Sequence, residues 1–160
     1  MARRLFYLML EFTPFEINVA LRLLAATVCG LVVGFNRDMK QKPTGMRTLG
    51  LVSLGACVAS LAGPQADLMR SEPDAMSRVV QGVLQGVMTG IGFIGAGVIL
   101  KLPCDGTVKG LTTAASVCIT AALGVACALA SWKIIALGVL LTLQVLILPR
   151  KLAKAMGSRV

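Results

Sequence analysis

The sequence predicts an all-α membrane protein: a polytopic bundle of about five transmembrane helices, with the N-terminus outside and the C-terminus in the cytosol. Of the 160 residues, 56% are hydrophobic and only 14% are charged, and the mean hydropathy is +0.83. Ordinary globular chains carry roughly 25% charged residues, so this chain has too few charges to cover a surface in water. The lipid bilayer is therefore the expected surroundings of much of this surface.

Five apolar stretches supply the predicted helices. Each is close to the roughly 20 residues that a helix needs to cross a hydrocarbon core of about 30 Å, and none shows the alternation of a barrel strand. The stretches are Ile17–Phe35, Met46–Gly63, Val79–Leu100, Gly110–Ser131 and Lys133–Leu148. They divide the chain into an N-terminal interfacial segment (1–16), a transmembrane domain (17–148) and a basic cytosolic tail (149–160).

The distribution of lysine and arginine predicts the orientation. If the connections alternate between the two sides, ten basic residues share the side of the C-terminus and five lie on the other side. Cytosolic connections carry the excess of positive charge, so the side with ten is assigned to the cytosol, although Arg3 and Arg4 oppose this. Membrane topology alone thus accounts for the net charge of +9. Binding of nucleic acid is not expected, because the basic connections lack aromatic residues on which bases could stack.

The third stretch contains Gly90-x-Gly92-x-x-Gly95, the spacing of a dinucleotide-binding loop. Such a loop follows a strand and precedes an acidic ribose ligand, whereas Gly90 lies inside an apolar run. The glycines instead extend a face of small residues that suits close helix packing in lipid. This candidate packing or partner face comprises Gly82, Gly86, Gly90, Gly92, Gly95 and Gly97, together with Thr112 and Thr113 of the next stretch.

Small and polar residues beside this face predict further contacts. The first stretch has the same four-residue spacing of glycines, Gly30-x-x-x-Gly34, and should also pack closely on another helix. In the fourth stretch, a stripe that recurs every four residues is expected to face the glycines; it consists of Thr112, Ser116, Thr120 and Gly124. Gln81 and Gln85 should point into the bundle or at a partner, because amides facing lipid are costly. They serve either as hydrogen-bonding contacts between helices or as part of a conduction path.

The densest polar cluster lies between the first two stretches. Its candidate functional residues are Asn36, Arg37, Asp38, Gly45, Arg47 and Thr48. Arg37, Asp38 and Arg47 can pair at the cytosolic surface and pin the helical hairpin. The alternative is that they are simply the positive charge of a short cytosolic loop.

The chain offers little chemistry for catalysis or metal binding. It has no histidine, and its five cysteines form no C-x-x-C motif, so the cysteines are expected to be small packing residues. Arg22 is the one charge well inside a stretch, and we expect it to snorkel outward. Magnesium prefers oxygen ligands, often carboxylates, and the five apolar stretches contain no aspartate or glutamate. We therefore predict a protein that is not an enzyme, with no catalytic residue, no metal ligand and no cofactor.

Taken in order, these segments resemble the membrane domain of the MgtC/SapB family over roughly residues 20–130. The resemblance rests on GFNR (34–37), GMRT (45–48), GA (55–56), GIGFIGAGVI (90–99), KGLTTAA (109–115) and TAALG (120–124). It implies a multi-pass protein of the bacterial inner (plasma) membrane, linked to growth in low Mg²⁺, acid tolerance and virulence. It also implies a partner, because at least one member binds and restrains the F-type ATP synthase; the older description as a Mg²⁺ transporter is disputed.

Two departures from the family pattern stand out. The family usually has Gly-x-Glu-Arg where this chain has Gly34-Phe35-Asn36-Arg37, and one hypothesis is that Asp38 compensates for the missing acid. Some members carry a soluble regulatory domain after the helices. Because this sequence ends about a dozen residues beyond the fifth stretch, it is expected to lack that domain.

Two functions follow from this pattern. The first is a non-enzymatic modulator of another membrane system, with the ATP synthase as a candidate, acting in low-Mg²⁺, acid or virulence adaptation. Its partners would be the bilayer, another membrane protein and further copies of the same chain in a homo-oligomer, but not nucleic acid. The alternative is a transporter or channel for Mg²⁺ or another cation, with a path lined by Gln81, Gln85 and Thr120.

Overall fold

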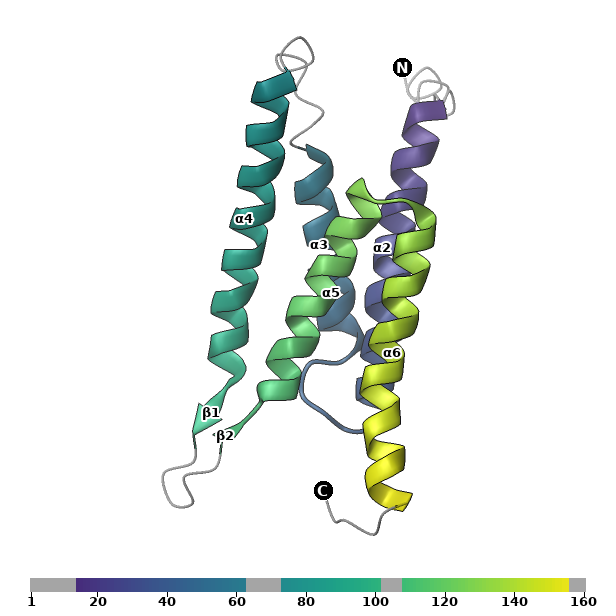
Figure 1. Cartoon of the computed structure of the whole chain (residues 1–160), viewed down its shortest axis with the longest axis vertical. Coiled ribbons are helices and arrows are strands. Elements are labelled where there is room, and N and C mark those ends of the chain that lie inside the picture. The colour runs from purple at the N-terminus through teal and green to yellow at the C-terminus, as the bar shows by residue number, and fades with distance from the viewer. Residues whose placement is uncertain (1–13, 63–72, 102–107, 156–160) are drawn as a thin grey trace, which may run out of the picture.

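The computed structural model describes residues 14–62, 73–101 and 108–155. Within these ranges the chain forms five helices that run side by side as a bundle, with their connections at its two ends (Figure 1). They are α2 (Pro14–Asp38), α3 (Met46–Ala62), α4 (Pro73–Val98), α5 (Leu111–Leu129) and α6 (Trp132–Ala155). The predicted all-α membrane bundle is confirmed.

The helices differ in how completely they can cross a bilayer. Three are long and apolar enough: α2, the part of α4 from Met76 to Val98, and α5. α3, with 17 residues, and the segment Trp132–Ile147 of α6 are apolar but shorter. At 1.5 Å per residue α3 rises only about 25 Å, so crossing a bilayer would require local thinning of the bilayer or flanking residues that reach the interface.

Several helix ends differ from the predicted ones. α2 begins at Pro14, so residues 14–16 belong to the first helix, and the rest of the predicted interfacial segment lies outside the described residues. α4 begins at Pro73 rather than Val79, because proline in the first turn followed by an acid forms a favourable helix N-terminus. α6 continues to Ala155, so the first part of the predicted tail is helical.

A short ribbon, which the sequence did not predict, connects α4 to α5. Strands β1 (Leu100–Lys101) and β2 (Val108–Lys109) pair antiparallel, with Leu100 opposite Lys109. Gly110 then turns the chain into α5 with a φ of 95°, a conformation that glycine adopts readily and other residues rarely. A side chain at Gly110 would also collide with the backbone carbonyl of Val98.

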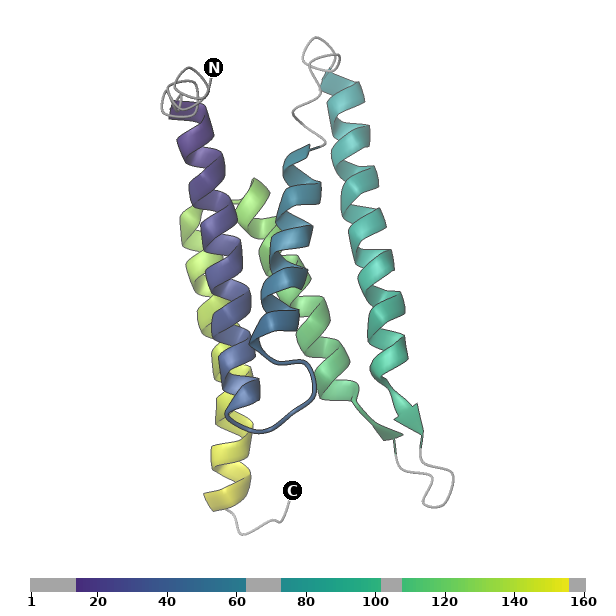
Figure 2. The ribbon, with the colours of Figure 1, turned by 180° about the vertical axis from the view of Figure 1, so that it is seen from behind.

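α2, α3 and α5 contact one another and form the centre of the bundle. α4 lies on one side, where it packs mainly on α5, and α6 lies on the other (Figures 1 and 2). Glycines allow the close approach of α2 to α3: a Cβ at Gly30 would lie 2.5 Å from the Leu49 carbonyl oxygen, and one at Gly34 would lie 2.5 Å from the Met46 Cα. Gly30-x-x-x-Gly34 therefore packs two helices together, as its spacing predicts.

The polar stripe of α5 does not face the glycines of α4, so that prediction is wrong. Gly124 lies against the backbone of Ser53 in α3, and Ser116 accepts a hydrogen bond from Arg37 of α2. The stripe faces the centre of the bundle, because Arg37 of α2 and the backbone of α3 both lie on that side of α5. α4 meets α5 elsewhere: a Cβ at Gly95 would lie 3.6 Å from the Ala114 Cβ.

Arg22 does not snorkel outward as expected, but caps the end of α5. Its Nη1 donates to the backbone oxygens of Cys127 at 2.8 Å and Ala128 at 2.9 Å, and its guanidinium lies 5.8 Å from the centre of the Trp132 ring. Carbonyls at a helix C-terminus lack intrahelical donors and carry the negative end of the helix dipole. The arginine therefore joins α2 to the α5–α6 turn.

The cysteines of the central helices behave as packing residues. Cys29, Cys57 and Cys127 are buried in one cluster with Ala26 and Ala128, and all three are free thiols. The sulfur atoms of Cys29 and Cys127 lie 4.0 Å apart. The expectation from their apolar surroundings in the sequence is confirmed for these three residues.

Candidate functional site

Arg37 is the centre of the polar cluster at the end of the bundle where α2 passes into α3. It lies in the last turn of α2, and only 4% of its surface is exposed. Its Nε donates to the backbone oxygen of Thr44 at 3.1 Å, and its Nη2 donates to that of Pro43 at 2.7 Å. The arginine thereby holds the loop between α2 and α3 against the end of its own helix.

The same guanidinium also binds the first turns of α5. Nη1 donates to Ser116 Oγ at 2.9 Å, and Nη2 donates to Thr113 Oγ1 at 2.7 Å. Ser116 in turn donates its hydroxyl proton to the Thr112 carbonyl at 2.7 Å, which leaves its oxygen free to accept from the arginine. A planar guanidinium with five N–H donors can serve such divergent acceptors at once, so Arg37 connects α2, the loop and α5.

Asp38 and Gly45 fix the other end of the loop. Asp38 Oδ2 accepts a hydrogen bond of 2.8 Å from the backbone N–H of Met46, the first residue of α3. A side chain at Gly45 would collide with the Asp38 carboxylate. Asp38 thus satisfies a donor of the α3 N-terminus in the manner of a helix cap. The hairpin is held by these contacts, while Arg47, which was expected to join them, is exposed.

The loop backbone is strained next to Arg37. Gln41 and Thr44 have φ values of 48° and 61°, and left-handed backbone is unusual for any residue other than glycine, most of all for a β-branched one. The carbonyl of Thr44 is an acceptor of the arginine. Such strain persists only where the surrounding contacts determine the conformation, and at Thr44 Arg37 supplies such a contact.

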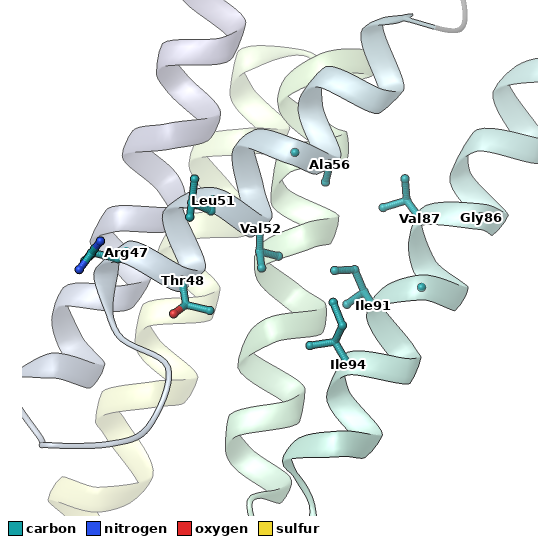
Figure 3. Close-up of a pocket in the computed structure, with 11 residues that line it drawn as sticks. Arg47, Thr48, Leu51, Val52, Ala56, Gly86, Val87, Ile91 and Ile94 are labelled. Atoms are coloured by element: carbon teal, nitrogen blue, oxygen red, sulfur yellow. The ribbon is translucent and has the colours of Figure 1, made fainter.

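Arg47 and Thr48 line a groove of about 760 Å³ between α3 and α4 (Figure 3). Gly86 and Gly90 of α4 and Gly55 of α3 also line it. A Cβ added at any of these three glycines would meet no atom within 4 Å. The two helices therefore face each other across the groove without closing it.

The remaining residues of the predicted glycine face divide into two groups. Gly95 packs on α5, but Gly82, Gly92 and Gly97 have no neighbour within 4 Å of an added Cβ. Gln81 and Gln85 are exposed, so they do not point into the bundle. The part of this face away from Gly95 is thus unoccupied within the described chain, and its role as a partner surface stays a prediction.

A second cavity, of about 710 Å³, lies between α2, α5 and α6. Asn36, Arg37 and Thr112 line it, together with Lys40 and Lys42, whose place in the sequence indicates only basic charge in a loop. Thr113 belongs instead to the Arg37 cluster. The wall that α6 contributes could not be predicted, because the apolar sequence of that helix gives no sign of which residues face inward.

The described part of the chain provides no group of three or more histidine, cysteine or acidic residues that could hold a metal ion. The residues that line the groove and the cavity include basic, hydroxyl and amide side chains, but no carboxylate. The chemistry available at both places is hydrogen bonding, positive charge and apolar contact.

Comparison with known proteins places this architecture in a family. The sequence model of the MgtC family matches residues 23–155. The chain is 41% identical to Protein SrpB of Synechococcus elongatus over 138 residues, which is 81% of this chain and 74% of that protein. It is 38% identical to Protein MgtC of Salmonella typhimurium over 113 residues, and 33% identical to Protein SapB of Bacillus subtilis over 114 residues.

The last two matches cover 71% and 68% of this chain but only 44% and 47% of the relatives, so the chain spans about half their length. No solved structure matches it. The family match includes Arg37 of α2 and all of α3, α4, α5 and α6. Because that match extends over most of the sequence, the chain belongs to the MgtC family.

Proposed function

We propose that the chain is a non-enzymatic, multi-pass protein of the bacterial inner membrane that modulates another membrane protein through the groove between α3 and α4. The observation that carries this proposal is the open, small-residue surface of that groove. Gly55, Gly86 and Gly90 line it and have no neighbour within 4 Å of an added Cβ.

In lipid, contact with another helix stabilises such a surface. Small side chains let two backbones approach closely, and helix association in lipid is driven by that packing and by interhelical hydrogen bonds. Gln81 and Gln85 add the second element, since both are exposed on α4 and an amide facing hydrocarbon is costly without a hydrogen-bonding partner. A helix seated in the groove would also lie close to Arg47 and Thr48.

The family suggests where to look for the partner. The resemblance in sequence to the MgtC/SapB family implies the proton-translocating ATP synthase and conditions of low Mg²⁺ or acid stress. A second copy of this chain is the other candidate occupant, because the glycine and glutamine surface can pair with itself.

The experiment is co-purification of the tagged full chain from native membranes under low-Mg²⁺ or acid stress. Gly86→Leu should reduce the recovered partner at least tenfold by filling the groove, whereas Ala96→Leu, on an exposed part of α4 outside the groove, should retain it. Both variants should fold, because position 86 has open space and Ala96 is exposed. Recovery of the chain alone, or equal recovery of the partner with Gly86→Leu, would contradict the proposal.

Cation transport makes a different prediction. The described groove and cavity carry Arg37, Lys40, Lys42 and Arg47 in their linings and no carboxylate, so they repel Mg²⁺ rather than replace its oxygen ligands. We expect the purified chain in liposomes to take up no more Mg²⁺ than empty vesicles do. Uptake that saturates with Mg²⁺ and is lost on Thr120→Val would favour the transporter instead.

A further inference from the structure

The cavity between α2, α5 and α6 has a charged end and an apolar end. Lys40 and Lys42 lie in the loop after α2, at the cytosolic end, and Arg37 contributes to the wall beside them. Toward the middle of the bilayer the lining changes to Ile119 and Leu141. The partner contact proposed above involves the opposite side of the bundle and does not use this cavity.

The charged end attracts anions. The guanidinium of Arg37 is held in place by Thr113 and Ser116, so its charge is fixed in the wall. Lys40 Nζ lies 3.4 Å from the Leu146 carbonyl oxygen of α6, which places its ammonium at the rim between the two helices. Three positive charges with no carboxylate among the described lining residues create a positive potential.

The apolar end is open to lipid. Ile119, Leu141 and Val145 line the cavity and are respectively 40%, 50% and 70% exposed. Leu141 and Val145 are one turn apart on α6 and form a continuous apolar strip. A small hydrophilic anion would fill the charged end and leave this strip uncovered, so the cavity as a whole fits an amphiphile.

We infer that this cavity binds one anionic phospholipid of the cytosolic leaflet. The phosphate group lies between Lys40 and Lys42, and the first part of an acyl chain lies along Ile119, Leu141 and Val145, while the rest of the lipid remains in the bilayer. Basic pockets between transmembrane helices on the cytosolic side recognise anionic headgroups in this way, and the mobile ammonium groups of lysines suit a phosphate as point charges.

The test measures the binding of fluorescent phosphatidylglycerol to the purified full chain in phosphatidylcholine nanodiscs, with fluorescent phosphatidylcholine as the neutral probe. We expect at least a tenfold preference for phosphatidylglycerol. Each lysine near an anionic lipid contributes roughly a fivefold change in affinity. Lys42→Gln should therefore weaken binding about fivefold, and Lys40→Gln with Lys42→Gln about 25-fold. Val145→Trp should weaken it by covering the apolar strip.

Lys109→Gln is the matched control, because it removes an exposed charge from the same end of the bundle at a residue outside the cavity. Thermal unfolding in detergent checks that every variant is folded. Equal binding of the two lipids, or equal loss in Lys109→Gln and Lys42→Gln, would overturn the inference. Competition by inorganic phosphate at concentrations equal to those of the lipid would also overturn it, since the site would then recognise the free anion alone.

Discussion

Replacing Arg37 with alanine should lower the free energy of unfolding by roughly 3–5 kcal/mol. The variant removes the donors of the Thr44 and Pro43 carbonyls and of the Thr113 and Ser116 hydroxyl oxygens. A buried polar group left without its partner costs about 1–3 kcal/mol, and the strained loop loses the contact that holds it. Reversible unfolding by SDS in mixed micelles measures the change.

Two further variants test whether the loss of stability is specific to the Arg37 guanidinium. Arg47→Ala removes an exposed arginine nearby and should change stability by no more than about 0.5 kcal/mol. Arg37→Lys keeps the charge but cannot reproduce the planar fork of donors, so it should recover only a small part of the loss. If Arg37→Ala and Arg47→Ala were equally stable, the buried arginine would not be holding α2, the loop and α5 together.

Adding one methyl group should have opposite effects at two glycines. Gly124→Ala should destabilise the bundle by about 2–3 kcal/mol, because the new Cβ would collide with the Ser53 carbonyl and lie 3.0 Å from its Cα, and overpacking of this kind costs about 1–3 kcal/mol. Both contacting atoms belong to backbone, so α3 and α5 must move apart. Comparing SDS unfolding curves with the unsubstituted chain measures the effect.

Gly86→Ala is the matched control in another helix. Nothing lies within 4 Å of its new Cβ, and alanine is favoured over glycine inside a helix by roughly 0.5–1 kcal/mol. We therefore expect this variant to be unchanged or slightly more stable. A loss of stability with Gly86→Ala equal to that with Gly124→Ala would mean that the groove between α3 and α4 is closed in the membrane.

The apolar stretches predicted the helices well, because the length of a span and its hydropathy are properties of a local run of residues. Met46 was placed correctly as the start of α3, and the Gly30 and Gly34 spacing correctly indicated close packing. The partner of a helix face is not a local property. The four-residue steps from Ser116 through Thr120 to Gly124 define one side of α5, but not whether α4 or α3 covers it.

The role of Arg37 could not be predicted from the sequence for a similar reason. On the cytosolic side of a membrane, a basic residue at a helix end is expected from topology alone, and the sequence gives no sign that this one is buried. Its hydroxyl acceptors, Thr113 and Ser116, follow 76 and 79 residues later. Only the tertiary structure brings them together, and only the tertiary structure places Lys40 and Lys42 in one cavity with residues of α6.

The two arginines of α2 also determine an order of events during synthesis. Arg22 binds the last turn of α5, and Arg37 binds its first turns, yet α2 emerges from the ribosome well before α5. At about 5–20 residues per second, Thr113 follows Arg37 by roughly 4 to 15 seconds. For that interval α2 carries two arginines whose α5 acceptors do not yet exist, so its final depth in the membrane is set only when α5 arrives.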